Sequence, residues 1–234
     1  MNPTDALIVL QARMGSTRLP GKSLRTIGER SILARCLERL LAGRAAPLLL
    51  ATTTQPEDDA LVEEASRFGV PVVRGSADDV LGRFGQAVAL VAPAYVIRAT
   101  ADNPAVDIDA PARVLAYLRR GGLDYVVERG LPVGAAVEGM RASALLEAVA
   151  AATDAYDREH VTPFLKRPER RYRVFEPLVA PPIQRPDLRL TVDTADDLEY
   201  MTGVLGRCGL GTSVMPLSAI IQSADRIVRI REVA

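Results

Sequence analysis

Short, continuous apolar runs alternate with segments of helical periodicity through the first half of the chain. The runs have the length of strands buried on both faces of a sheet; they are Leu7–Leu10, Pro47–Ala51, Val70–Val73, Tyr95–Ala99 and Asp124–Val127. The helical segments are Ser31–Ala42, Glu57–Phe68, Asp79–Val91 and Ala110–Arg120, with Ser31 and Asp109 as expected N-caps. This alternation predicts an α/β fold in which helices flank a mostly parallel, mixed central sheet.

The alternation loosens after Gly130. Helices are expected at Ala142–Thr153, Glu159–Lys166, Ala195–Leu205 and Pro216–Ala224, and extended segments at Tyr172–Glu176 and Leu188–Val192. A length of 234 residues suits one large domain. We therefore expect a single domain, 1–234, with a regular half over residues 1–130 and a less regular half over residues 131–234.

The segment Gln11–Lys22, QARMGSTRLPGK, follows the first predicted strand, where α/β proteins place phosphate-binding loops. It combines cations, hydroxyls and glycines: Arg13, Gly15, Ser16, Thr17, Arg18, Gly21 and Lys22. Glycines permit backbone conformations that turn amide groups toward an anion. The loop is not a Walker A motif, because five residues rather than four separate Gly15 from Gly21, and the chain has no GxGxxG. We predict a triphosphate loop of another kind.

Charge and composition exclude several other functions. Basic and acidic residues number 29 each, which argues against a dedicated nucleic-acid binder. The single histidine, His160, and the well-separated Cys36 and Cys208 do not make a zinc-binding pattern. No apolar stretch approaches the roughly 18 residues of a membrane-spanning helix, and no signal peptide is apparent. We expect a cytoplasmic protein whose partners are small molecules, with no nucleic acid and no membrane.

The phosphate loop resembles the N-terminal signature of the cytidylyltransferases that make CMP-activated sugars. It is most similar to the group named for spore coat polysaccharide biosynthesis protein F; CMP-ketodeoxyoctonate and CMP-acylneuraminate synthetases are more distant. Four later segments resemble that group in the same order: Gly75–Phe84, Arg98–Asp107, Glu159–Phe164 and Leu190–Leu198. The resemblance implies a Rossmann-like, GT-A-type nucleotidyltransferase fold, Mg²⁺ as cofactor and CTP as donor. It also implies a sugar acid or related acidic acceptor, and a homodimer formed through the second half.

Two aspartates stand directly after extended segments, Asp102 after YVIRATA and Asp193 after LRLTV. Nucleotidyl transfer needs positioning and charge neutralisation, which Mg²⁺ supplies when one or two carboxylates hold it. In the resembling family the aspartates at these positions hold the metal. The structural alternative is that Asp102 ends a turn and Asp193 caps the helix that begins near Ala195.

The resemblance also assigns roles to other side chains. It implies that Arg13, Lys22 and Asp102 are catalytic. The expected nucleotide-binding residues are Gln11, Ala12, Arg13, Met14, Gly15, Ser16, Arg18, Lys22, Thr53, Ser76, Asp78, Asp79, Arg83 and Arg98. The expected acceptor-binding residues are Asn103, Glu138, Glu159 and His160. Asp78 and Asp79 fit an acidic helix start equally well, and a lone histidine is more often structural than catalytic.

The acceptor segment departs from the family pattern Gly-Leu-Asp-Val-Glu-Val-Phe. Here Gly134–Met140 keeps Glu138, but Ala136 and Met140 replace the aspartate and the aromatic residue, and Ala101 stands where the family prefers glycine. These departures predict a changed acceptor rather than a changed reaction.

Two other functions stay open. Asp107 and Asp109 match the DxD of GT-A glycosyltransferases, which use nucleotide sugars. A non-catalytic nucleotide-binding module is the other alternative. Spacing alone does not distinguish cytosine from uracil or guanine.

Overall fold

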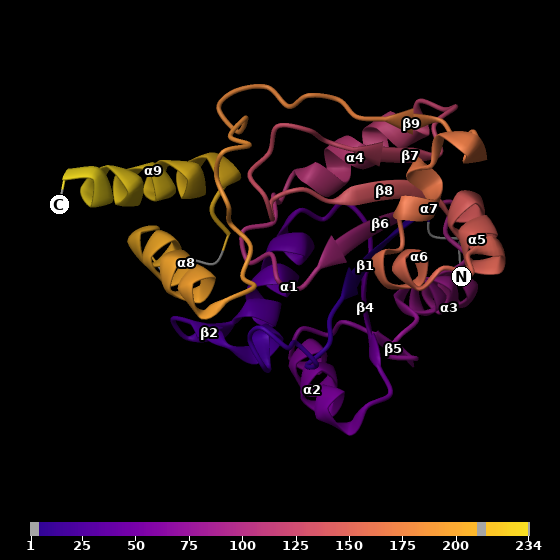
Figure 1. Cartoon of the computed structure of the whole chain (residues 1–234), viewed down its shortest axis with the longest axis horizontal. Helices are drawn as coiled ribbons and strands as arrows, with labels where there is room; N and C mark the ends of the chain where they lie inside the picture. The colour runs from indigo at the N-terminus through magenta and orange to yellow at the C-terminus, as the bar shows by residue number, and fades with distance from the viewer. Residues whose placement is uncertain (1–4, 210–213, 234) are drawn as a thin grey trace.

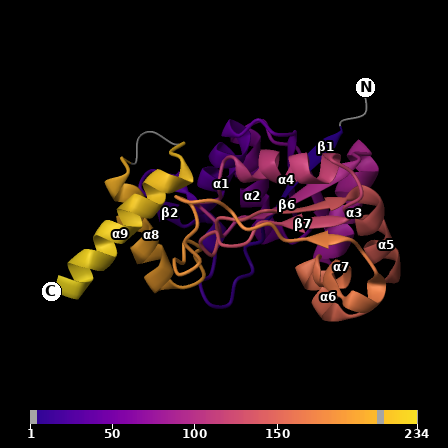
Figure 2. The same ribbon diagram turned by 90° about the horizontal axis from the view of Figure 1, so that it is seen from above.

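A mixed sheet runs through the molecule, with helices on both faces (Figures 1 and 2). The computed structural model describes residues 5–209 and 214–233. Within these residues the strand order is β5-β4-β1-β6-β8-β7-β9. The strands are β1 (Ala6–Gln11), β4 (Leu48–Thr53), β5 (Val72–Gly75), β6 (Tyr95–Thr100), β7 (Tyr125–Val127), β8 (Glu138–Arg141) and β9 (Val174–Phe175), and a separate pair is β2 (Thr26–Ile27) with β3 (Arg30–Ser31).

Most neighbouring strands are parallel, and β8 supplies the mixed character. β1 pairs in parallel with β4 and β6, while β8 runs antiparallel to both β6 and β7. β8 does not stand out in the sequence, because Glu138 and Gly139 are poor strand formers. Packing requires the glycine: a Cβ on Gly139 would lie 2.3 Å from a methyl group of Val114. The predicted α/β class is confirmed.

Two hydrophobic clusters lie on opposite faces of the sheet, because successive side chains of a strand point to opposite sides. Ile8 and Leu10 of β1 belong to one cluster, and Leu7 and Val9 to the other. Residues of α1, α4, α8 and α9 join the first, and residues of α3 and α5 the second. The helices are α1 (Ile32–Ala42), α2 (Asp59–Arg67), α3 (Val80–Val91), α4 (Ala110–Arg119), α5 (Ala142–Ala151), α6 (Ala155–His160), α7 (Pro163–Lys166), α8 (Ala195–Arg207) and α9 (Leu217–Val233).

The predicted cap of the first helix is confirmed, whereas that of the fourth is only half right. The Ser31 hydroxyl accepts the Ala34 N–H at 2.9 Å. Asp109 occupies the N-cap position of α4, but its side chain makes no capping hydrogen bond. Instead, its N–H donates to Oδ1 of Asp107 at 3.3 Å.

Two further predictions in the second half hold only in part. The predicted helix Glu159–Lys166 is interrupted: α6 ends at His160, Val161 takes φ 69°, and α7 starts at Pro163. Pro163 lacks an N–H and cannot continue the hydrogen-bonded ladder of α6. The break itself falls at Val161, because Thr162 keeps right-handed helical angles, φ −96° and ψ −16°. The predicted extended segment Leu188–Val192 belongs to none of the named strands but makes one isolated parallel bridge, between Arg189 and Val133.

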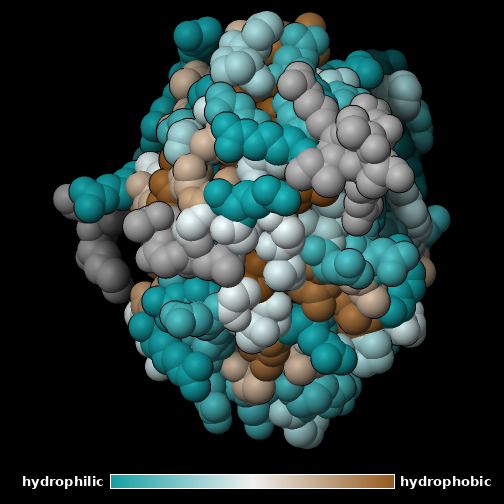
Figure 3. Space-filling view, turned by 90° about the vertical axis from the view of Figure 1, so that its left-hand side faces the viewer, coloured by the Kyte–Doolittle hydropathy of each residue, from teal (hydrophilic) through white to brown (hydrophobic). Residues whose placement is uncertain are grey.

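The surface is mixed in character. Figure 3 looks onto the end of the molecule where α8 and α9 lie, and hydrophilic side chains there surround small hydrophobic patches. None of the described helices has the length and apolar character that crossing a membrane requires.

Candidate active site

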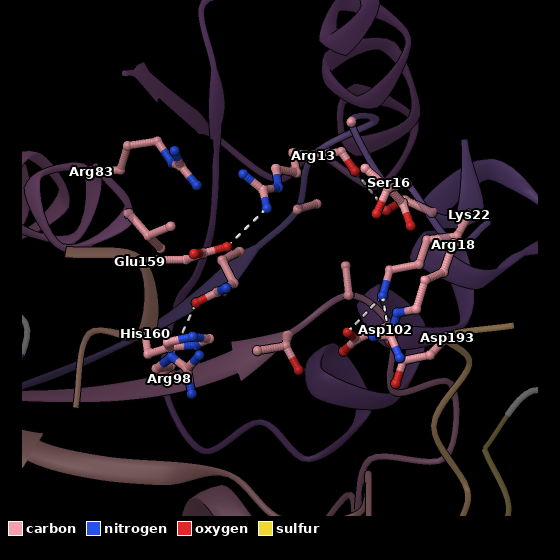
Figure 4. Close-up of a pocket in the computed structure, with 18 residues that line it drawn as sticks. Arg13, Ser16, Arg18, Lys22, Arg83, Arg98, Asp102, Glu159, His160 and Asp193 are labelled. Carbon is pink, nitrogen blue, oxygen red and sulfur yellow. Dashed lines mark hydrogen bonds and ion pairs between the residues drawn. The ribbon is translucent and has the colours of Figure 1, made fainter. Parts of the chain in front are cut away.

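A pocket of about 350 Å³ opens at the carboxyl ends of β1 and β6 (Figure 4). Open α/β sheets bind ligands at this edge. The lining residues are Gln11, Ala12, Arg13, Gly15, Ser16, Thr17, Arg18, Lys22, Ser23, Val80, Arg83, Arg98, Thr100, Ala101, Asp102, Glu159, His160 and Asp193. Most of the predicted phosphate loop, both predicted metal aspartates and two predicted acceptor residues are therefore together. The cations in this lining outnumber the carboxylates, which suits an anionic ligand.

The phosphate loop is fixed from beneath by Asp58. Oδ1 of Asp58 accepts the Met14 N–H at 2.7 Å, and Oδ2 accepts the Thr52 hydroxyl at 2.9 Å. Burial raises the pKa of the Asp58 carboxyl, but these hydrogen bonds and those from Thr53 outweigh burial and lower it. The carboxylate therefore stays charged and holds the loop. Thr53, predicted to bind nucleotide, is buried in this network and does not line the pocket.

The two loop glycines differ in what they provide. Gly21 has φ 67° and directly precedes the short 3-10 helix Lys22–Leu24, so it starts the turn that presents Lys22. Gly15 does not have a positive φ, so it does not use the conformational freedom that glycine permits. A Cβ added to Gly15 would meet nothing within 4 Å, so this residue leaves open space beside the pocket.

Asp102 and Asp193 converge on one ammonium group (Figure 4). Nζ of Lys22 lies 2.9 Å from Oδ2 of Asp102 and 3.0 Å from Oδ1 of Asp193. Arg18 and Arg189 also contact Asp193, at 3.0 and 2.6 Å. The two segments are joined directly, because the Val192 N–H donates to the Asp102 carbonyl at 2.8 Å.

Asp193 does not cap α8, although capping was the structural alternative to a role in binding metal. The N-cap of α8 is Thr194, whose hydroxyl accepts the Asp197 N–H at 3.2 Å, and Asp197 completes a capping box. The carboxylate of Asp193 instead points into the pocket, where it contacts Lys22.

Neighbouring charges shift the pKa values of Lys22 and Asp193 toward their charged forms. Burial lowers the pKa of Lys22, but Asp102 and Asp193 outweigh it and the net pKa is raised. Burial raises the pKa of Asp193, but Lys22, Arg189 and Arg18 lower it overall. Carboxylate oxygens are the donors that Mg²⁺ prefers, and the ion commonly takes one or two carboxylates together with phosphate oxygens and waters. The residues therefore fit a magnesium ion, although no group of three or more potential ligands occurs in the described chain.

Seven predicted site residues do not line the pocket: Met14, Thr53, Ser76, Asp78, Asp79, Asn103 and Glu138. Asp79 caps α3 by accepting the Gly82 N–H at 2.8 Å, so its structural interpretation is confirmed. Ser76 and Asp78 are exposed in the turn before α3. Asn103 donates to the Thr100 hydroxyl at 2.7 Å, next to the pocket wall.

Glu138 lies behind the pocket in an ionic cluster. It is the cross-strand neighbour of Arg98, with which it forms an ion pair. Its Oε1 also accepts from Lys166 and from the Thr162 hydroxyl, each at 2.9 Å, and from the Tyr125 hydroxyl. Burial raises the pKa of Glu138, but Arg98 and Lys166 outweigh it and bring the pKa to about 2.

This depressed pKa predicts a pH-dependent contribution to stability. The folded pKa is about 2 and the ordinary value 4.5, so stabilisation is complete above pH 4.5 and is lost as pH falls toward 2. We expect Glu138→Gln to lower the free energy of unfolding by about 3 kcal/mol at pH 7 and by much less near pH 3. Urea unfolding of both proteins between pH 7 and pH 3 measures this, and a pH-independent difference would contradict it.

Sequence reasoning named Thr17 as part of the phosphate loop but left four other lining residues without a role in the site: Ser23, Val80, Thr100 and Ala101. Thr100 and Ala101 directly precede Asp102. Residues at the end of the strand next to the predicted metal ligand could therefore have been included in the predicted site. The Ser23 hydroxyl donates to the Arg13 carbonyl at 3.4 Å, a contact that spacing does not reveal.

A basic loop after the first strand, facing a pair of carboxylates, places this protein among the nucleotidyltransferases. Residues 7–208 match the family model described as cytidylyltransferase. The chain belongs to the cytidylyltransferase family.

Individual relatives agree with this assignment. The spore coat polysaccharide biosynthesis protein SpsF of Bacillus subtilis (strain 168) is 35% identical over 214 residues, 88% of this chain and 88% of that protein. A cytidylyltransferase structure from Leptospira borgpetersenii serovar Hardjo-bovis (strain JB197) matches with a TM-score of 0.88 and 27% identity, over 97% of this chain and 96% of that one.

Two solved structures with bound ligands share the fold at lower identity. CMP:2-keto-3-deoxy-manno-octonic acid synthetase, solved with CTP, has a TM-score of 0.67 and 18% identity, covering 87% of this chain and 99% of that one. Rv0371C from Mycobacterium tuberculosis H37Rv, solved with manganese, has a TM-score of 0.64 and 18% identity, covering 85% of this chain and 98% of that one.

Proposed function

We propose that this protein is a magnesium-dependent cytidylyltransferase that transfers CMP from CTP to a sugar acid or related acidic acceptor and releases pyrophosphate. One observation carries the proposal: Asp102 and Asp193 converge within 3.0 Å of Lys22 beside a basic loop. The family assignment, the CTP complex of one fold relative and the manganese complex of another support it.

In this reaction an acceptor oxygen forms a bond to the α-phosphorus of CTP, the bond from that phosphorus to the bridging oxygen breaks, and pyrophosphate leaves. Arg13, Arg18 and Lys22 are placed to bind the triphosphate and to neutralise the charge that develops on the leaving group. Mg²⁺ held by Asp102 and Asp193 would polarise phosphate oxygens. Lys22, now shared between the carboxylates, would then be free to contact phosphate.

The remaining pocket residues divide between base and acceptor. We assign Gln11, Ala12, Gly15, Ser16 and the buried Arg83 to the nucleotide. Met14, Thr53, Ser76, Asp78 and Asp79 lie outside the lining and are proposed to shape the nucleotide site from behind. Glu159 and His160, at the end of α6, are proposed to contact the acceptor, and Asn103 to support the wall beside it.

We further propose a cytoplasmic homodimer formed through the second half. β9 is the edge strand of the sheet, and its Val174 and Phe175 side chains are exposed, as is Leu178. Exposed apolar residues on a sheet edge favour association. Light scattering of the purified protein tests the dimer.

The glycosyltransferase alternative finds no support at the DxD sequence. Asp107 is buried and its Oδ2 lies 2.6 Å from Arg113, which also pairs with Glu128. Neither Asp107 nor Asp109 lines the pocket. Asp107 therefore serves the packing of α4 rather than a metal.

Calorimetric titration with each of the four ribonucleoside triphosphates tests the nucleotide part of the proposal. We expect CTP to bind at least tenfold more tightly than the others when Mg²⁺ is present, and chelation to weaken that binding. Equal binding of all four, or binding unaffected by chelator, would contradict it. Tight CTP binding without turnover of any acceptor would favour a non-catalytic module.

A further inference from the structure

The guanidinium of Arg98 lines the pocket and is held in place by two neighbouring side chains. It lies in β6, and its side chain is 15% exposed. Its Nε donates to Oε1 of Gln11 at 3.0 Å, and its Nη1 pairs with Glu138. Its Nη2 has no hydrogen-bond partner among the residues that the structure describes. The guanidinium is therefore held on two sides and retains donors for a ligand.

The ionic cluster formed by Arg98, Glu138 and Lys166 carries more positive than negative charge. Among the residues that the structure describes in this cluster, a single carboxylate, Glu138, pairs with two cations, Arg98 and Lys166. The Tyr125 and Thr162 hydroxyls donate to the same carboxylate and bring no charge. The cluster thus carries one surplus positive charge, and Arg98, its member that lines the pocket, is where an anionic ligand group could neutralise it.

The same cluster also fixes the part of the pocket wall that His160 forms. The Thr162 N–H donates to the His160 carbonyl at 2.8 Å across Val161, which has φ 69° and ψ −54°. A γ-turn of this kind is rare, and a β-branched residue seldom adopts it. Glu138 holds the turn through the Thr162 hydroxyl, so one carboxylate sets the positions of both Arg98 and His160.

We propose that Arg98 determines acceptor specificity by binding a carboxylate of the acceptor, and that Glu138 is the positioning residue behind it. This inference rests on the proposed function. A planar guanidinium with free donors is suited to a carboxylate, which it binds through charge-assisted hydrogen bonds. Glu138 does not line the pocket, so it acts through Arg98 rather than on the acceptor.

The position of Arg98 favours the acceptor over the triphosphate. In Figure 4, Lys22, Arg18, Asp102 and Asp193 group on one side of the pocket, and Arg98 lies on the other side with His160. The triphosphate has its own cations in the phosphate loop. The Arg98 side of the pocket therefore remains for the second substrate.

The experiment compares Arg98→Gln with Arg18→Gln, a matched loss of one pocket guanidinium. Acceptor probes are sugar acids, including gluconate and 3-deoxy-manno-octulosonate, each paired with its neutral alcohol. Pyrophosphate release gives kcat and the acceptor KM, and calorimetry without acceptor gives CTP affinity. Thermal unfolding checks that each variant folds, and Arg98→Lys provides a second variant that keeps the charge.

We expect the wild type to use acids and not their alcohols. Arg98→Gln should raise the acceptor KM about thirtyfold with CTP affinity changed less than twofold, and Arg98→Lys should restore part of the loss. Arg18→Gln should mainly weaken CTP. Glu138→Gln should raise the acceptor KM and lower kcat, with partial rescue by Glu138→Asp.

Two results would overturn the inference while leaving the proposed function intact: use of the neutral alcohols as well as of the acids, or CTP binding weakened by Arg98→Gln as much as by Arg18→Gln. A wild type that does not bind CTP with Mg²⁺, or that binds CTP but uses none of the acids, would overturn both.

Discussion

Asp102→Asn is expected to lower kcat/KM for CTP at least a thousandfold, about 4 kcal/mol of transition-state stabilisation, without unfolding the protein. The asparagine keeps the shape of the side chain but loses the charge that, with Asp193, faces Lys22. A magnesium site reduced to one carboxylate would bind the ion weakly and would neutralise less charge on the leaving pyrophosphate.

Asp193→Asn should have a similar effect, because both carboxylates contact the same cation. Asp109→Asn is the matched control: it lies outside the pocket, and its side chain makes no capping bond to α4. Steady-state kinetics with varied Mg²⁺ distinguish the roles, because raising the metal concentration should recover part of the lost activity. Unchanged turnover in either site variant would remove that aspartate from the metal site.

Lys22→Met is expected to lower kcat/KM at least a hundredfold through loss of a triphosphate contact. The same substitution should not weaken the binding of the metal ion. Nζ of Lys22 competes for the oxygens of Asp102 and Asp193, so its removal leaves two adjacent carboxylates with less compensating charge. Divalent-metal binding in the absence of nucleotide should therefore be retained or become tighter.

Arg25→Met is the control for Lys22→Met, because Arg25 is an exposed cation three residues away that forms no ion pair with other described residues. Calorimetric titration with Mn²⁺ and Mg²⁺ gives the metal affinity of each variant, and steady-state kinetics give its kcat/KM. Weaker metal binding in Lys22→Met would show that the lysine and the metal do not compete for these carboxylates.

The sequence predicted the parallel half of the sheet well, because its strands are uninterrupted apolar runs such as Leu7–Leu10. It also located Asp102 and Asp193 by their positions after extended segments. Their convergence on Lys22 depends on contacts across 80 and 171 residues, which local patterns do not contain.

Glu138 shows why the second half was harder to predict. Family spacing places it in an acceptor segment, but β8 runs antiparallel beside β6, and its register sets Glu138 opposite Arg98. Its side chain therefore meets Arg98, Tyr125 and Lys166 behind the pocket. Asp58 was missed for a related reason: its partners Met14 and Thr52 come from two other segments.

Pyrophosphate release by the purified protein, with Mg²⁺, each ribonucleoside triphosphate and the pooled sugar acids, tests the central claim most directly. We expect release with CTP and an acid pool, abolished by chelator and by Asp102→Asn, together with a CMP-linked product. Turnover of a nucleotide sugar without pyrophosphate release, or release that is indifferent to chelator, would contradict the claim.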